Sequence, residues 1–321
     1  MEVETRYHPS AEQLALGSTI DDSLAALLPL SRLHTAHHED AKTWSDLEEI
    51  GVFGIGVSEE LGGSGLGAVE EALIVMNLGR RLASPGVLAT IGAAHARQLS
   101  GNAGASRARR TAAAYRQGDR IILVEEREAA LVLLRERSGT ALHAHPGVSR
   151  AVDERLWLAG LRELDEAGER LAQFDASQLL RLRLIDAAAL AGIAAAALEM
   201  GVAYAGMREQ FGRPIGSFQA VKHHCANMVM AARCARDQTN FAAVALDEGR
   251  PDAPLQVECA FYIAGSAALE NAGKNIQIHG GMGFSDEADP HLFLKRAQLL
   301  IAIAGGLEAA NSRIANIKVD G

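Results

Sequence analysis

Cysteine is scarce in this sequence of 321 residues. The three cysteines are Cys225, Cys234 and Cys259, and no two of them form a C-x-x-C pair. An odd number of cysteines without paired spacing argues against a disulfide framework and is typical of a reducing compartment. We therefore expect a cytoplasmic protein.

Long apolar runs and a basic leader are also missing. No stretch approaches the ~18–20 uninterrupted apolar residues of a membrane span. The first thirty residues lack a basic segment followed by a long apolar run, so we expect no signal peptide. The longest apolar stretch, Ala187–Leu198, is mostly alanine, which suits a helix packed tightly against other helices.

Aromatic residues make up only 4% of the chain, whereas hydrophobic residues of all kinds make up 48%. Alanine is used heavily and loses least on entering a helix, so the composition favours a mainly helical protein. Acidic residues outnumber basic ones by 40 to 31, which gives a net charge of −9. An acidic chain repels a phosphate backbone, so we expect no nucleic acid partner, while a local basic site can still hold one anionic cofactor.

The sequence divides into three parts, which span residues 1–117, 118–176 and 177–321. The loop Ser58–Gly67 contains four glycines and predicts a turn-rich excursion within the first part. Hydrophobic spacing and capping residues predict that the rest of the first part is helical. The predicted helices cover Ser10–Leu30, a segment that starts at Thr43 as N-cap, Ala68–Leu82, and a segment from Pro85 through His95.

The second part has strand character over Arg120–Val124 and Ala129–Leu134, with a turn at Ser138 and Gly139. The charged segment Ala151–Gln173 fits either strand or helix. The third part is predicted to be four long helices joined by short loops, which indicates a four-helix bundle. These helices are expected over Ser177–Met207, Ser217–Glu248, Ala253–His279 and Pro290–Ile317.

A first cluster of candidate binding residues lies where one long helix should end and the next begin. Arg208 and Phe211 are three residues apart, a spacing that places both on one helix face. Gly212 is predicted to end that helix and Pro214 to prevent its continuation. With Gln219, the cluster offers a guanidinium, an aromatic face and an amide, which suit a diphosphate and its nucleotide. The alternative is a capped helix end with an exposed arginine.

A second cluster closes the third long helix. Gly280, Gly281 and Gly283 follow Gln277, and glycines let a backbone come close to a ligand. The alternative is an ordinary helix end capped by glycine.

We expect no metal site. His34, His37 and His38 have metal-ligand spacing on a helix, but a solvated helix end explains them. The His-His-Cys run that ends at Cys225 places adjacent side chains in different directions, which argues against a nucleophile and its base.

Taken together, the two clusters resemble the C-terminal domain of acyl-CoA dehydrogenases. The pattern R-x-x-F-G-x-P-I that begins at Arg208, and Q-I-H-G-G-M-G-F that begins at Gln277, carry the resemblance, which extends through Pro290–Arg296. The N-terminal part agrees at Trp44, in the glycine-rich loop, and at Leu78–Arg80. The resemblance covers roughly residues 10–110 and 180–320.

The resemblance implies a FAD-dependent oxidoreductase that converts acyl-CoA thioesters to 2-enoyl-CoA. In the family, a glutamate removes the α-proton while a hydride passes from the β-carbon to the flavin. A carboxylate serves as base because its environment can raise its pKa toward the working pH. The family's tetramer shares each FAD between neighbouring subunits. The resemblance implies that the diphosphate and adenosine of a FAD seated in the adjacent subunit are held by Arg208, Phe211, Gln219, Gln277 and Gly281.

The positions of the family's base hold no proton acceptor here. The C-terminal position corresponds to Gly305, and the alternative position, on the first long helix of the C-terminal domain, corresponds to Leu182. Arg183 matches a family arginine and is a candidate for substrate contact. Leu307 replaces the family threonine that contacts FAD. Glu308, three residues past Gly305, is a candidate for a shifted base.

The middle part also departs from the family. Neither the T-E-P-x-x-G-S-D-like segment nor the W-I-T-N-like strand, which clamp the isoalloxazine ring, occurs between Gly118 and Ser177. The chain thus keeps the half of the FAD site that it would donate and lacks the half that it would use. This is expected of the partner subunit in an α2β2 acyl-CoA dehydrogenase, similar to the pairs with which actinobacteria degrade steroids and whose wide site accepts a bulky acyl-CoA.

Three interpretations follow. The first is a subunit of a heterotetramer that is inactive and binds little FAD until it joins a catalytic paralogue. The second is a complete homomeric acyl-CoA dehydrogenase with Glu308 as relocated base. The third is a non-enzymatic helical scaffold that binds only a partner protein, against which the joint presence of the nucleotide-site residues argues.

Overall fold

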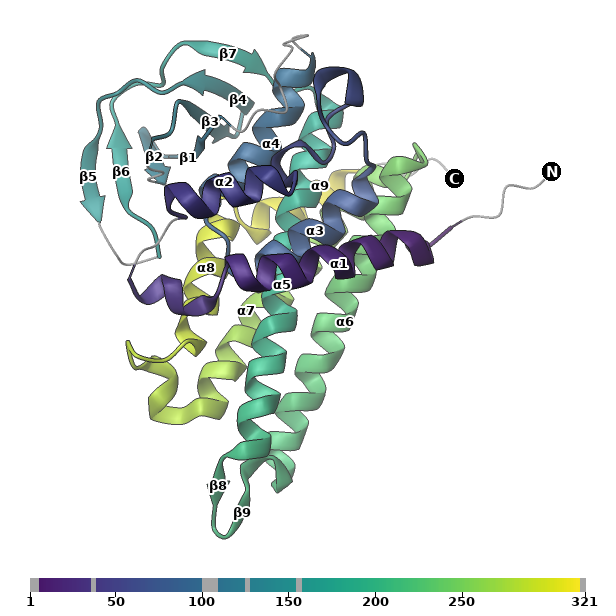
Figure 1. The fold of residues 1–321 in the computed structure, drawn as a ribbon, viewed down its shortest axis with the longest axis vertical. Coiled ribbons are helices and arrows are strands. Elements are labelled where there is room, and N and C mark those ends of the chain that lie inside the picture. The colour runs from purple at the N-terminus through teal and green to yellow at the C-terminus, as the bar shows by residue number, and fades with distance from the viewer. Residues whose placement is uncertain (1–5, 36–38, 100–108, 125–127, 154–157, 318–321) are drawn as a thin grey trace, which may run out of the picture.

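The computed structural model describes residues 6–35, 39–99, 109–124, 128–153 and 158–317. Figure 1 shows a curved sheet, N-terminal helices beside it, and a bundle of long helices that extends well beyond both. The predicted fold class, mainly helical with a sheet between two helical regions, is confirmed.

The N-terminal helices begin close to the predicted positions. Asp40 is the N-cap of the second helix, and its Oδ1 accepts a hydrogen bond from the backbone N–H of Thr43 at 2.7 Å. The prediction of Thr43 as N-cap was therefore wrong by one turn, because an aspartate further upstream satisfies the first free N–H groups. The helices are α1 (Ala11–Leu27), α2 (Ala41–Glu49), α3 (Ala68–Arg80) and α4 (Pro85–Leu99), with 3-10 turns η1 (Leu30–His34), η2 (Val52–Gly54) and η3 (Glu59–Leu61).

The middle region is one seven-stranded sheet in the order β5-β6-β2-β1-β3-β4-β7. Thr111–Gln117, which the sequence placed in the helical first part, is a strand at the centre of this sheet and pairs in parallel with β3. The ambiguous segment Ala151–Gln173 contributes strands. The strands are β1 (Thr111–Gln117), β2 (Arg120–Val124), β3 (Leu131–Glu136), β4 (Gly139–Ala144), β5 (Arg150–Asp153), β6 (Leu161–Leu164) and β7 (Arg170–Gln173).

Side chains alternate between the two faces of the sheet, as a period of two requires. On one face Leu131 and Leu133 pack with residues of α4 and of the bundle. On the other face Val132 and Leu134 belong to a separate apolar cluster. The sheet is thereby fixed against the helices by a continuous apolar layer.

The C-terminal bundle follows the predicted boundaries except in its last helix. Pro290–Ile317 breaks at Gly305 and Gly306, whose φ angles of 90° and 87° are incompatible with a right-handed helix. The bundle consists of α5 (Ala176–Met207), α6 (Gln219–Asp247), α7 (Ala253–His279), α8 (Pro290–Ile303) and α9 (Leu307–Asn316), with a two-stranded hairpin β8 (Glu209–Gln210) and β9 (Arg213–Pro214) and turns η4 (Ile215–Ser217) and η5 (Gly280–Phe284).

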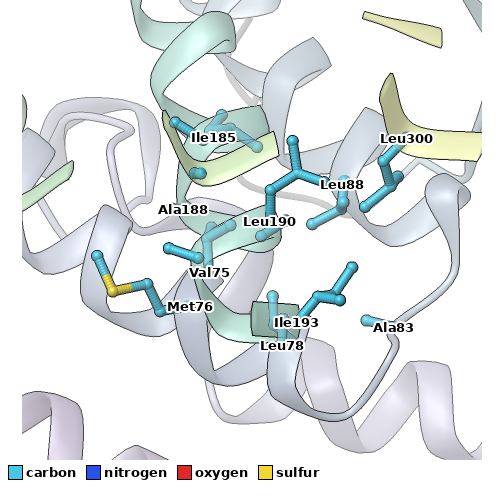
Figure 2. Packing of buried hydrophobic residues seen from close by; sticks show 14 of the residues in the cluster. Val75, Met76, Leu78, Ala83, Leu88, Ile185, Ala188, Leu190, Ile193 and Leu300 are labelled. Atoms are coloured by element: carbon cyan, nitrogen blue, oxygen red, sulfur yellow. The ribbon is translucent and has the colours of Figure 1, made fainter. Parts of the chain in front are cut away.

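Helix α5 is the central helix of the molecule. Its length and apolar composition would allow it to cross a bilayer, but 67% of its most apolar window is buried inside the structure. Figure 2 shows Leu190 and Ile193 of α5 among apolar side chains of α3, α4 and α8. The apolar composition of α5 is therefore explained by its position in the core of the bundle.

Helices α3 and α5 approach until their backbones touch. A Cβ at Gly192 would lie 2.0 Å from the carbonyl oxygen of Met76, and a Cβ at Gly79 would lie 2.1 Å from that of Ala189. Each helix thus contributes a glycine where the other presents a carbonyl. This contact leaves no space between α3 and α5 at the crossing.

Replacing Gly192 with alanine should lower the free energy of unfolding by about 1–3 kcal/mol, because the helices must move apart to admit the methyl group. The matched control is Gly273→Ala on α7, where an added Cβ would meet nothing within 4 Å. The control should be neutral or stabilise the protein by up to ~1 kcal/mol. Urea denaturation measures both variants, and equal stabilities would contradict the close approach of α3 and α5.

Candidate functional site

The first cluster lies on a hairpin at the free end of the bundle, where Figure 1 shows β8 and β9. Helix α5 ends at Met207, and Arg208 adopts an extended conformation as its C-cap. Phe211 and Gly212, with φ angles of 54° and 75°, form the two-residue turn between Gln210 and Arg213. Positive φ at both central positions is typical of a tight β-hairpin.

Two predictions about this segment were therefore wrong. Arg208 and Phe211 do not share a helix face, and Gly212 is not the residue that ends the helix, because the chain leaves the helix four residues earlier. The backbone N–H of Ile215 donates to the carbonyl of Arg208 at 2.7 Å and closes the hairpin. The hairpin presents both candidate side chains outward instead.

Phe211 is unusually placed for an aromatic residue. Its exposed fraction is 92%, and its positive φ is rare for a bulky side chain. The ring meets Phe218 edge to face with centroids 6.1 Å apart, and the guanidinium of Arg213 lies 4.2 Å from the centroid of Phe218. Phe218 and Arg213 thus hold the hairpin, and most of the Phe211 ring surface stays accessible to a molecule outside this chain.

The second cluster lies at the same end of the bundle. Gln219 is the first residue of α6, Gln277 lies in the last turn of α7, and both are exposed. Ala205, Met228 and Ile278 form an apolar cluster that holds the ends of α5, α6 and α7 together. The structure therefore gathers both clusters around one end of the bundle.

The polar side chains of the two clusters have no bonding partners among the described residues. Within the described part of the chain, no hydrogen bond or ion pair engages the side chains of Arg208, Gln219 and Gln277. A Cβ at Gly281 would meet no atom within 4 Å, so its backbone is open to close approach. One forked cation, two amides and an accessible backbone are donors that fit a diphosphate and its nucleotide.

Sequence reasoning missed the exposed apolar side chains that surround these donors. The exposed fractions are 75% for Met207, 56% for Met282 and 73% for Phe284. Large exposed apolar residues gathered in one region mark an interaction surface. Met282 and Phe284 could have been suspected, because they belong to the same glycine-rich motif as Gly281.

The two base positions meet at the other end of α5. Leu182 is 2% exposed and packs in the cluster that joins the sheet to α8, whereas Gly305 is exposed in the turn between α8 and α9. Nη1 of Arg183 donates to the carbonyl oxygen of Ala304 at 2.7 Å. This bond brings the residue after Leu182 to the residue before Gly305, so the two positions are neighbours in space.

Arg183 is the centre of a buried chain of ion pairs. Its Nε lies 3.5 Å from Oε1 of Glu258, and its Nη1 lies 3.8 Å from Oδ2 of Asp186. Arg135 forms two hydrogen bonds to Asp186, and Arg313 forms two to Glu258. Burial lowers the pKa of Arg183, and the two carboxylates oppose that effect. The guanidinium is thus used by contacts within the chain, and its predicted contact with substrate remains a prediction.

The remaining candidates have different surroundings. Glu308 is exposed in the first turn of α9. Leu307 packs toward α7, because a Cβ at Gly265 would lie 2.6 Å from its Cδ2. His34 contacts the Asp289 carboxylate at 2.7 Å, and His37 and His38 lie outside the described residues. No group of three metal-ligating side chains occurs in the ranges that the structure describes.

Glu71 is a buried carboxylate that sequence reasoning did not single out. It contacts His95 at 2.9 Å and Arg181 at 2.7 Å, and so ties α3 to α4 and α5. Burial by itself raises the pKa of Glu71, but the charges of His95 and Arg181 outweigh it and lower the pKa to about 2. A base needs a raised pKa, so Glu71 serves the structure rather than proton transfer.

The lowered pKa of Glu71 predicts a dependence of stability on pH. The charged form stabilises the fold fully above the ordinary pKa of 4.5, and this contribution is lost as the pH falls through about 2. The pKa difference corresponds to about 3 kcal/mol. Denaturation curves between pH 2 and 7 should show this loss in the unmodified chain and not in Glu71→Gln. The control Glu49→Gln, at an exposed site on α2, should keep it, and a Glu71→Gln profile that matches the unmodified chain would rule the contribution out.

Comparisons with known proteins agree with the family resemblance of the N-terminal and C-terminal parts. Residues 10–104 match the family model "Acyl-CoA dehydrogenase, N-terminal domain", and residues 173–317 match "Acyl-CoA dehydrogenase, C-terminal domain". The chain is 30% identical to acyl-CoA dehydrogenase IpdE2 of Mycobacterium tuberculosis over 80% of each protein. It is 41% identical to FadE34 of the same species over 44% of this chain, which spans only 19% of that longer relative.

Among solved structures, the fold is similar to a chain of the ChsE4-ChsE5 complex from Mycobacterium tuberculosis. The TM-score is 0.77 and the sequence identity is 24%, over 97% of this chain and 98% of that chain. At this identity the likeness establishes the fold alone.

Proposed function

Because the chain belongs to the acyl-CoA dehydrogenase family, we propose that it is the non-catalytic subunit of a heteromeric enzyme that desaturates an acyl-CoA thioester. In this proposal it donates half of a FAD site to a catalytic paralogue. The observation that carries the proposal is the separation of its two functional regions along α5.

That separation follows from helix geometry. Leu182 lies near the start of α5 and Arg208 caps its end, 26 residues later. At ~1.5 Å per residue the two positions are roughly 39 Å apart along the helix. Ligand pockets of ~300–1,000 Å³ are roughly 10 Å across, so one pocket of this chain cannot contain both. The separation therefore supports the proposal that these residues serve a ligand whose reactive end lies in a neighbouring subunit.

The region around the base positions supports the absence of proton transfer by this chain. Leu182 and Gly305 have no ionisable side chain, and the nearby cation, Arg183, is used by internal carboxylates and the Ala304 carbonyl. The base for the α-proton would then come from the partner subunit. This division explains why the chain can keep its nucleotide-site residues after losing the acceptor.

The uncommitted donors at the hairpin end have defined tasks in this proposal. FAD, when bound, supplies the hydride acceptor. Arg208 would pair with its diphosphate, while Gln219 and Gln277 would orient the nucleotide by hydrogen bonds and Phe211 would cover it. Gly281 would allow the backbone to approach. The exposed Met and Phe side chains around them suit the apolar centre of a subunit interface.

The relatives support the proposed partner and substrate. The similar fold in the ChsE4-ChsE5 complex belongs to an assembly of two named proteins, and we propose an α2β2 arrangement with a catalytic paralogue for this chain. The resemblance to steroid-degrading pairs favours a bulky, steroid-derived acyl-CoA as the substrate of the assembled enzyme. The cytoplasm, where such soluble enzymes act on CoA esters, is the proposed location.

Arg208→Ala should weaken FAD binding by the assembled enzyme while leaving assembly intact. Loss of one charge-assisted hydrogen-bond partner corresponds to about 1.5–3 kcal/mol, or roughly 10- to 150-fold in affinity. The matched control is Arg236→Ala, an exposed arginine on α6 that pairs with its neighbour Asp237. Flavin absorbance after gel filtration of the co-expressed complex measures the effect. Unchanged flavin content in Arg208→Ala would favour the scaffold interpretation.

The variant Glu308→Gln distinguishes the proposed heteromeric subunit from a homomeric enzyme that uses Glu308 as its base. If Glu308 were the base, its conversion to an amide would remove a general-base contribution of about 10²–10⁴-fold. We expect unchanged turnover in the complex, because Glu308 is exposed and lies at a helix N-terminus. Turnover is measured with an artificial electron acceptor. A collapse of turnover with normal flavin content would replace the proposal with the homomeric enzyme.

A further inference from the structure

Residues 280–289 connect α7 to α8 and carry part of the candidate nucleotide site, including Gly281. This segment is attached to the rest of the molecule at two places. In its first half Gly283 packs on α7, because an added Cβ would lie 2.5 Å from the carbonyl oxygen of Ile276. Its second half contacts His34, the last residue of η1. In Figure 1 the purple turn after α1 lies beside the yellow-green segment that precedes α8.

Each of the two ring nitrogens of His34 faces a hydrogen-bond acceptor. Nδ1 lies 2.9 Å from the carbonyl oxygen of Asp286, and Nε2 lies 2.7 Å from Oδ1 of Asp289. A carbonyl oxygen and a carboxylate oxygen accept hydrogen bonds and donate none. A neutral imidazole has one N–H, so it can make only one of these bonds and turns a lone pair toward the other oxygen. Only the imidazolium form, with two N–H donors, satisfies both contacts.

The other ionisable groups of this region do not produce the same dependence on pH. In the described part of the chain they are Arg32, Asp286, Glu287, Asp289, His291 and Lys295. A hydrogen bond from a serine hydroxyl lowers the pKa of Glu287, and the carboxyl groups, lysine and arginine titrate far from neutral pH. Burial, with Lys295 as a second cause, lowers the pKa of His291. Its titration has the opposite sign, because a buried neutral histidine stabilises the fold less as the pH falls.

We propose that His34 is a pH-dependent latch on residues 280–289. When the ring is protonated, it donates to both Asp286 and Asp289 and holds the second half of the segment against η1. When the ring loses its proton, one of the two bonds is lost and the segment opens more readily. Histidine changes charge between about pH 5 and pH 8, so the latch is closed at the acidic end of this range and released at the other. The side chains of His34 and Asp289 are 28% and 34% exposed, so the proton exchanges with solvent.

The latch regulates the candidate FAD half-site, because the segment that it holds carries Gly281 and the exposed side chains of Met282 and Phe284. A segment that is already fixed loses less conformational freedom when it binds a ligand. FAD is therefore retained more tightly with the latch closed. This regulation rests on the function proposed above, whereas the latch itself is a property of the chain alone.

Hydrogen exchange of the chain alone tests the latch. The backbone N–H groups of Ser285 and Ala288 donate to carbonyl oxygens within the segment, so their protection reports how often it opens. After correction for intrinsic exchange rates, we expect their protection to fall about 2- to 10-fold between about pH 6 and pH 8, the effect of one lost hydrogen bond. Amides in the middle of α5 serve as the internal reference. Protection of the segment that stays constant or rises with pH would overturn the proposal.

Two variants assign the effect to the two side chains. His34→Gln has no proton to lose in this range, so protection should be the same at both pH values. Asp289→Asn should also remove the pH dependence, because its amide can accept from a protonated ring or donate to a neutral one. Asp289 makes no capping hydrogen bond to α8, so the start of that helix is kept. The control His8→Gln, at an exposed histidine near the N-terminus, should keep the fall. A fall that persists in His34→Gln would place its origin elsewhere.

Flavin retention by the co-expressed complex tests the regulation. FAD should dissociate up to about 10-fold more readily at pH 8 than at pH 6 in the unmodified complex, and this difference should disappear in His34→Gln. A complex that binds FAD with the same pH dependence in both forms would overturn the regulation. A complex without flavin at either pH would contradict the proposed function instead, and the exchange measurement would still decide the latch.

Discussion

The guanidinium of Arg183 is the contact on which the arrangement of this molecule depends. It pairs with Asp186 on its own helix and joins α5 to Glu258 of α7 and to the carbonyl of Ala304. Through Arg135 on β3 and Arg313 on α9, the same chain of ion pairs connects the sheet to the far side of the bundle. Removing one partner of a buried ion pair typically costs about 3–5 kcal/mol, because the other charge is left uncompensated. The region of the two base positions is therefore crosslinked by ion pairs within the chain.

The two ends of α5 have opposite characters. At the Arg183 end, the charged side chains form ion pairs with one another within the chain. At the hairpin end, the side chains of Arg208, Gln219 and Gln277 are exposed and without partners in the described structure, and Phe211 points into solvent. A chain that functioned alone would gain nothing from so many exposed side chains without bonding partners. The contrast is what a subunit requires if its structural half is self-sufficient and its functional half is completed by another chain.

Local signals in the sequence were sufficient to predict most of the helices and strands, but not the segments that connect them. Helical spacing placed α3 and α7 almost to the residue, and β-branched and aliphatic runs placed β2 over Arg120–Val124. Thr111–Gln117 was missed as a strand because its alanines favour helices, and only pairing with β2 and β3 makes it a strand. The hairpin was missed because Phe211 adopts a positive φ that sequence does not favour. The candidate FAD-binding residues came from the family pattern, whereas the role of Glu71 emerged only from its contacts with His95 and Arg181.

The flavin content of the assembled enzyme tests the central claim most directly. The chain is expressed alone and together with a full-length acyl-CoA dehydrogenase paralogue, and the ratio of FAD to polypeptide is measured in each purified sample. We predict little flavin in the lone chain and one FAD for every two chains in the complex, since each FAD is shared between one copy of each subunit. One FAD per copy of this chain when it is purified alone, with dehydrogenase activity, would contradict the account.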